Sequence, residues 1–142
     1  MMLRPFNTAD LPRIAELWLE TNVRAHDFVP ESYWRGNLDA VREMLPEATI
    51  FVWEENRVIA GFIGLSDSYI AGIFVDATHQ SRGVGRRLLD YVKVEHDKLV
   101  LRVYRKNVRA RAFYKREGFV EVSESVDEAT GEVEVMMEWE RG

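Results

Sequence analysis

The sequence predicts a domain of the α/β (α+β) class, with one central mixed sheet that is mostly antiparallel and flanked by helices. Two observations support this prediction. Apolar runs rich in β-branched residues alternate with segments whose apolar residues recur every three or four positions, in the order β-α-α-β-β-β-α-β-α-β-β. In addition, no repeat, low-complexity tract or linker interrupts the chain, so residues 1–142 are expected to form one domain.

The N-terminal part is predicted to hold a short strand, residues 2–4, and two helices. The first helix lies within "NTADLPRIAELWLETN", where Thr8 or Asp10 can cap it and Pro12 fits its first turn. An aromatic-rich loop, "HDFVPESYWRG", is expected to follow, and then a short second helix around residues 38–45.

Three strands are expected next. The stretch "TIFVWEENRVIAGFIGLS" contains two β-rich runs joined at Glu55-Asn56, which is typical of an antiparallel hairpin. "YIAGIFVD" is expected to be a buried strand because its apolar run is nearly unbroken. After a turn with two glycines, "RRLLDYVKVEH" predicts a helix that points Leu88, Leu89 and Val92 inward.

The C-terminal part is predicted to add three strands and a helix. A strand lies in "LVLRVYR", and the helix in "VRARAFYKREG" ends at Gly118. Two further strands flank Thr130-Gly131, and the last of them alternates apolar residues with mostly glutamates, so it should bury one face only.

The composition excludes several classes of protein. There is no cysteine, which rules out disulfides, thiolate metal ligands and a cysteine nucleophile. The scattered His26, His79 and His96 do not suggest a metal site, so none is expected. No apolar run approaches the ~20 residues that a membrane span needs, and the N-terminus lacks the layout of a secretory signal. We therefore expect a cytoplasmic protein with no membrane partner.

The charge is distributed unevenly along the chain. The net charge is −5, yet twelve of the 19 lysines and arginines lie between Arg82 and Arg116, whereas residues 121–140 contain acids and no base. A basic segment suits a phosphorylated ligand. Nucleic acid is not an expected partner, because the chain is acidic overall and has no recognised reading motif. The sequence does not decide between a monomer and a homodimer.

The two-glycine turn "QSRGVG", Gln80 to Gly85, lies between the buried strand and a helix. Glycines let the backbone approach a phosphate closely, and the N-terminus of the helix offers unpaired N–H groups and a partial positive charge. A P-loop would need Lys and Ser or Thr after Gly85, where Arg86-Arg87 stands. A dinucleotide fingerprint would need a third glycine at Leu88. The turn therefore predicts a phosphate site of another kind.

This turn resembles the acyl-CoA pyrophosphate motif of the GNAT superfamily of N-acetyltransferases. The strand "LVLRVY", Asn107, Ala112-Phe113-Tyr114 and Gly118-Phe119 match at that family's usual spacing, and the resemblance covers the whole chain. The pieces "WEE", "HDF" and "YW" are similar to the small bacterial YiaC/YjaB-like subgroup, whose members are treated as lysine or amine acetyltransferases.

The resemblance implies that acetyl-CoA is the co-substrate and a primary amine the acceptor. The expected acceptor is a protein lysine or else a small cationic amine, and the amine attacks directly in a ternary complex. The alternative is a CoA-binding module without catalysis, against which Tyr114 argues because such a module needs no acid.

The resemblance also implies which residues hold acetyl-CoA. The backbone of Ile73 to Val75 would pair with the pantetheine arm and polarise the thioester oxygen. N–H groups of Arg82 to Arg87 would hold the pyrophosphate, with arginine side chains adding charge-assisted contacts. The implied cofactor-binding residues are Ile73, Phe74, Val75, Gln80, Arg82, Gly83, Val84, Gly85, Arg86, Arg87, Asn107 and Tyr114.

Acetyl transfer to an amine needs a proton donor for the departing thiolate and a route for the amine's proton. Tyr114 is the expected general acid. His26, Glu54 and Glu55 are candidates for the general base, and the sequence does not choose among them. His26, Phe28, Tyr33 and Tyr69 are expected around the acceptor, where aromatic walls would suit a lysine stem or ammonium.

Overall fold

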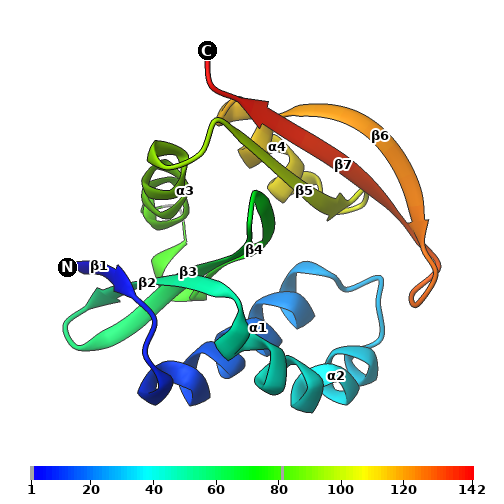
Figure 1. The fold of residues 1–142 in the computed structure, drawn as a ribbon. Helices are drawn as coiled ribbons and strands as arrows, with labels where there is room; N and C mark the ends of the chain where they lie inside the picture. Colours follow the sequence, from blue (N-terminus) through cyan, green and yellow to red (C-terminus); the bar gives the residue numbers. More distant parts are fainter. Residues whose placement is uncertain (1, 81) are drawn as a thin grey trace.

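The computed structural model describes residues 2–80 and 82–142, and within them it has one seven-stranded sheet in the order β1-β2-β3-β4-β5-β7-β6 (Figure 1). The element order confirms the predicted one. The strands are β1 (Met2–Pro5), β2 (Thr49–Glu55), β3 (Val58–Ser66), β4 (Tyr69–Val75), β5 (Lys98–Tyr104), β6 (Val120–Asp127) and β7 (Glu132–Glu140). The α-helices are α1 (Leu11–Ala25), α2 (Glu31–Met44), α3 (Val84–Val94) and α4 (Val108–Arg116).

The second helix is longer than the sequence predicted. It begins at Glu31 rather than near residue 38, so Tyr33 and Trp34 lie in its first turn and not in a loop. The chain enters α2 through Pro30, whose extended backbone serves as the N-cap. The Trp34 ring packs edge-on against Trp18 of α1, with 5.9 Å between ring centroids. This tertiary contact stabilises a helical turn that local propensity did not indicate.

Asp10, one of the two caps that the sequence predicted, occupies the N-cap position of α1. The side chain of Asn7 accepts a hydrogen bond from the N–H of Ala9 at 3.0 Å, and the carboxylate of Asp10 accepts one from the N–H of Asn7 at 2.9 Å. This reciprocal pair caps a short 3₁₀ turn, Thr8–Asp10, that leads directly into α1. Asp10 precedes α1 without a side-chain cap bond of its own to that helix.

The strands β4 and β5 form the only parallel pair in the described part of the sheet, and that pair is very short. They are paired at Tyr69 with Val100 and at Ile70 with Leu101. On the other side of β4, Gly64 pairs with Gly72 and Leu65 with Ile70, which leaves Ala71 as an extra residue in a β-bulge. Beyond the bulge β4 and β5 diverge. Figure 1 shows these two strands running apart, with α3 in the connection between them.

Helices cover both faces of the sheet. One core lies between α3, α4 and the central strands, and Leu88, Leu89 and Val92 are buried in it as predicted. A second core joins α1 to β2 and β3. A third, aromatic core lies where α1 and α2 meet the end of β5 and contains Val29, Trp34 and Tyr104. Among the described residues, no helix is long and apolar enough to cross a membrane.

A substitution at Gly61 in β3 tests how closely β3 and β4 approach each other. A Cβ atom at Gly61 would lie 2.9 Å from the carbonyl oxygen of Phe74 in β4, whereas one at Gly64 would meet only a side-chain carbon of Ile50 at 3.9 Å. Gly61→Ala should therefore cost about 1–3 kcal/mol of unfolding free energy, as overpacking does. Gly64→Ala on the same strand should stay near the wild type. Urea midpoints of the two variants measure this, and equal midpoints would contradict the account.

Candidate functional site

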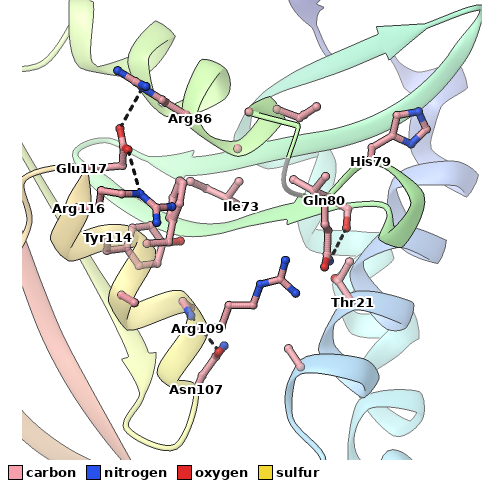
Figure 2. A pocket seen from close by; sticks show the side chains of 18 of the residues that line it. Thr21, Ile73, His79, Gln80, Arg86, Asn107, Arg109, Tyr114, Arg116 and Glu117 are labelled. Atoms are coloured by element: carbon pink, nitrogen blue, oxygen red, sulfur yellow. Dashed lines mark hydrogen bonds and ion pairs between the residues drawn. The ribbon is translucent and has the colours of Figure 1, made fainter.

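A cleft of about 1270 Å³ opens where β4 and β5 diverge (Figure 2). Its walls come from β4, the turn before α3, α3 itself, α4 and the last part of α1. Most of the predicted cofactor-binding residues line it: Ile73, Val75, Gln80, Gly83, Val84, Gly85, Arg86, Asn107 and Tyr114. The structure therefore brings together the two-glycine turn and the predicted acid, which are about 30 residues apart in the chain.

The two-glycine turn presents backbone donors to this cleft. Gly83 is the N-cap of α3 and has a left-handed φ of 81°, a conformation that favours glycine. The first bond within α3 runs from the N–H of Arg87 to the carbonyl of Gly83 at 3.0 Å. The N–H groups of Val84, Gly85 and Arg86 precede that bond and have no acceptor within the helix. Ser81 lies outside the described residues.

Two of the predicted arginines do not face the cleft. The guanidinium of Arg87 lies over the Trp53 ring, 5.4 Å from its centroid, and its N–H is used within α3. Arg82 is exposed and does not line the cleft. Consecutive residues of a helix point about 100° apart, so Arg86 and Arg87 leave α3 in different directions. Of the two, only Arg86 lines the cleft, where it lies 3.7 Å from Glu117.

Strand alternation separates the side chains of the predicted β4 contacts. Ile73 and Val75 line the cleft, whereas the Phe74 ring stacks on Phe62 in the core below α1, with centroids 4.8 Å apart. Phe74 therefore faces the cleft with its backbone only. The side-chain amide of Gln80 donates to the carbonyl of Val75 at 3.1 Å, and this bond ties the turn to the end of β4.

The cleft is lined by more cations than the sequence analysis named. The additional ones are Arg24 of α1, Lys93 of α3, and Arg109 and Arg116 of α4, and Figure 2 shows Arg109 extending into the cleft from the start of α4. Three of the four lie in the basic segment found in the sequence. Arg24 had no local signal, because the sequence alone does not show that α1 ends beside α4. The acids on this wall are Asp90 and Glu117.

The Tyr114 side chain is buried between α4 and β4 and borders the cleft, with 8% of its surface exposed (Figure 2). Its ring packs edge-on against Phe113 and Phe119. Burial raises the pKa of the phenol above its ordinary value, and the nearby Tyr69 adds to the rise. The hydroxyl therefore keeps its proton at neutral pH, as a proton donor must.

The structure does not support His26 as the general base. The Asn107 side chain caps α4 by accepting from the N–H of Ala110 at 3.2 Å, so its amide nitrogen is free to donate to Nε2 of His26 at 3.1 Å. The His26 ring stacks on Trp34 with centroids 5.3 Å apart and is absent from the cleft wall. Nε2, the ring nitrogen that could take up a proton, therefore already accepts a hydrogen bond from Asn107. Burial lowers the pKa of His26 to about 4, against the effect of the Asn22 carbonyl.

The two glutamates offered as alternative bases lie elsewhere. Glu54 accepts two hydrogen bonds from Arg4, at 2.8 and 3.1 Å, and this guanidinium also binds the buried Asp10. That group ties β1 to β2. Glu55 accepts from the indole of Trp53 at 3.1 Å and lies 3.5 Å from His79. Neither carboxylate lines the cleft.

The predicted acceptor residues gather on the other side of the divergence. Phe28 and Tyr33 pack into the aromatic core with Trp34 and Tyr104. Tyr69 begins β4 and is half-buried. Ile70 packs into the core under α3 and α4, so the neighbouring Tyr69 side chain points to the opposite face of the sheet. Because residues of α1 as well as of α3 and α4 line the cleft, it reaches both faces of the sheet.

Comparison with known proteins agrees with this geometry. The family described as "Acetyltransferase (GNAT) domain" matches residues 24–141. The chain belongs to the GNAT acetyltransferase family. It is thus an N-acetyltransferase, and the fold has the form that the resemblance in its sequence implied.

Two similar proteins agree with this assignment, and a third shares the fold. It is 38% identical over 120 residues to the peptidyl-lysine N-acetyltransferase YiaC of Escherichia coli K12, covering 83% of this chain and 82% of that protein. The solution structure of apo YjaB from Escherichia coli matches with a TM-score of 0.86 at 27% identity, over 97% of this chain and 96% of that one. The PaiA N-acetyltransferase of Thermoplasma acidophilum, solved with coenzyme A, matches with a TM-score of 0.84 at 16% identity, over 99% and 98%.

The pH dependence of stability should report the buried His26. In the unfolded chain a histidine takes up its proton near pH 6.5, whereas the folded ring does so only near 4. The unfolded state thus binds more protons in this window, so stability should fall as the pH drops from about 6.5 to about 4. The free energy of unfolding of His26→Gln, measured by denaturant titration, should fall less steeply across this window. An equally steep fall, or an NMR titration of His26 near pH 6.5, would contradict its burial as a neutral ring.

Proposed function

We propose that this GNAT protein transfers the acetyl group of acetyl-CoA to the side-chain amine of a protein lysine, by direct attack in a ternary complex. One observation carries the proposal: a single cleft is lined both by the N-terminus of α3, which begins after Gly83, and by the buried Tyr114. Two E. coli relatives are named peptidyl-lysine N-acetyltransferases, and a protein of the same fold was solved with coenzyme A, both of which favour this substrate pair.

The residues of the cleft fit the charge and shape of acetyl-CoA. The N–H groups of Val84, Gly85 and Arg86 would bind the pyrophosphate, helped by the partial positive charge at the start of α3. Arg86, Arg109 and Arg116 would supply the charge-assisted contacts to phosphate. The exposed edge of β4 from Ile73 to Val75 has lost β5 as a partner, so its backbone is available for the amide groups of the pantetheine arm. Acetyl-CoA supplies the activated acyl group.

The chain's own groups then promote the transfer. A backbone N–H on the free edge of β4 polarises the thioester carbonyl and stabilises the oxyanion that forms as the amine attacks. The C–N bond forms, the C–S bond breaks, and Tyr114 gives its proton to the departing sulfur. The nitrogen loses a proton as the amide forms, and this proton restores the Tyr114 hydroxyl by way of solvent. The chain contains no cysteine, so no acyl-cysteine intermediate lies on this path.

The acceptor class is tested with a lysine peptide whose N-terminus is blocked. The enzyme is mixed with acetyl-CoA and the peptide, and mass spectrometry measures the addition of one acetyl group per lysine. A parallel reaction uses the polyamine spermidine as the acceptor. The proposal predicts faster transfer, as kcat/KM, to the peptide. Faster transfer to spermidine would replace the lysine by a small cationic amine as acceptor. No transfer to either, despite binding of acetyl-CoA, would instead indicate a CoA-binding module.

A substitution of the proposed acid tests the mechanism. Tyr114→Phe keeps the ring packed between Phe113 and Phe119 and removes only the hydroxyl. Turnover should fall by about 10²-fold, while calorimetry should find acetyl-CoA binding close to the wild type. Tyr91→Phe is the matched control, because Tyr91 is 44% exposed on α3 and does not line the cleft. Unchanged turnover in Tyr114→Phe would remove Tyr114 from the chemistry.

A further inference from the structure

Two walls of the cleft come from helices that belong to different parts of the sheet. The α1 wall contains Thr21, Arg24 and Ala25, and the α4 wall begins with Asn107 and Arg109. Figure 2 shows Thr21 and Asn107 on opposite sides of the cleft. The helix α1 packs on β2 and β3, whereas α4 follows β5. Because the pairing between β4 and β5 is so short, the sheet itself does little to fix the spacing of the two walls.

A hydrogen bond joins these two walls. His26 directly follows Ala25 as the C-cap of α1, and its Nε2 accepts from the side-chain amide of Asn107 at 3.1 Å. The two residues are 81 positions apart in the chain, so the bond is a tertiary contact between α1 and the start of α4. The bond is partly buried, and water therefore competes with it less than it would at the surface.

The His26 ring is held firmly on the α1 side of this bond. It stacks on Trp34 and packs edge-on against Phe28 and Tyr104, with centroids 5.3, 5.6 and 4.9 Å away. The carbonyl of His26 also accepts from the N–H of Val29 at 3.0 Å. The aromatic cluster thus presents Nε2 in a fixed place.

Asn107 sets how α4 begins. Its backbone, with φ −82° and ψ 72°, forms an inverse γ-turn in which the N–H of Val108 donates to the carbonyl of Lys106 at 2.9 Å. The side-chain oxygen of Asn107 caps α4 at Ala110, which leaves the amide nitrogen for His26. A reversed amide would place its NH₂ group against the N–H of Ala110, so the cap and the bond to His26 require the same orientation.

The bond requires a neutral imidazole. Burial lowers the pKa of His26 to about 4, so Nε2 keeps its lone pair at neutral pH and can accept from the amide. A protonated ring would instead turn an N–H toward the amide N–H. The burial that makes His26 unsuitable as a base therefore makes it a suitable acceptor for Asn107.

We propose that His26 is a positioning residue of the cofactor cleft: by accepting the hydrogen bond from Asn107, it holds the α1 and α4 walls together before acetyl-CoA binds. This inference rests on the proposed function. Without the bond, ordering the walls becomes part of the cost of binding, and the affinity for acetyl-CoA falls. The walls carry Arg24 and Arg109, so their spacing also sets where two cations stand relative to the phosphates.

The test measures acetyl-CoA binding by calorimetry, and steady-state kinetics with acetyl-CoA and the blocked lysine peptide. His26→Leu occupies part of the space of the ring but offers no acceptor. It should raise the dissociation constant and KM for acetyl-CoA by about 10-fold, the effect of losing one hydrogen bond. Its kcat should stay near the wild type, because the bound cofactor then holds the walls together. His26→Gln, whose amide oxygen can accept the same bond, should restore the wild-type affinity.

Two further variants separate the bond from the packing of the cluster. Val29→Ala loosens the same cluster, where Val29 is buried, and leaves the bond in place. It should lower Tm and keep the wild-type affinity for acetyl-CoA. Asn107→Ser keeps a residue that can cap α4 but is too short to reach His26. It should also weaken binding, and adding His26→Leu to it should cause no further loss.

Three results would overturn the assignment: an unchanged dissociation constant in His26→Leu, an equal loss of affinity in Val29→Ala, or a further 10-fold loss when His26→Leu is added to Asn107→Ser. If His26→Leu does not fold, an unchanged affinity in Asn107→Ser overturns it instead. Any of these, with a wild type that binds acetyl-CoA, removes His26 and leaves the proposed transfer standing. A wild type that does not bind acetyl-CoA removes both.

Discussion

The early end of the pairing between β4 and β5 is the constraint on which the rest of this structure depends. Two parallel strands in the middle of a sheet would normally pair along their length, but here the bulge at Ala71 turns β4 away after Ile70. The sheet stays intact because β4 remains bonded to β3, and β5 to β7. The gap exposes backbone groups of β4 and connects the two faces of the sheet. A cofactor and an acceptor can therefore meet without either crossing the hydrophobic core.

The side chains that line the cofactor cleft differ in kind from those of the aromatic cluster on the other side of the gap. Cations of α1, α3 and α4 line the cofactor cleft, together with the N-terminus of α3, and these suit the phosphates of acetyl-CoA. The other face carries the aromatic cluster of Phe28, Tyr33, Trp34 and Tyr104, whose rings would suit a lysine stem or ammonium.

The sequence alone predicts the element order and most of the cleft, because these depend on local signals. Periodicity defines the strands and helices, and the turn at Gly83 to Gly85 requires glycine and a following helix. Such signals do not identify the general base. Glu54 follows Trp53 in the sequence and was a candidate base, yet its carboxylate accepts a hydrogen bond from Arg4. Likewise, the helical start of α2 depends on Trp34 packing against Trp18.

A thermal melt with and without acetyl-CoA tests most directly whether the cleft binds the acyl donor. At 100 times the dissociation constant, binding should stabilise the fold by about 2.7 kcal/mol, a rise of several degrees in Tm for a chain of 142 residues. NAD, which also carries a pyrophosphate, serves as the control. A rise with acetyl-CoA and none with NAD is the result that the account predicts. No rise at saturating acetyl-CoA, or an equal rise with NAD, would contradict it.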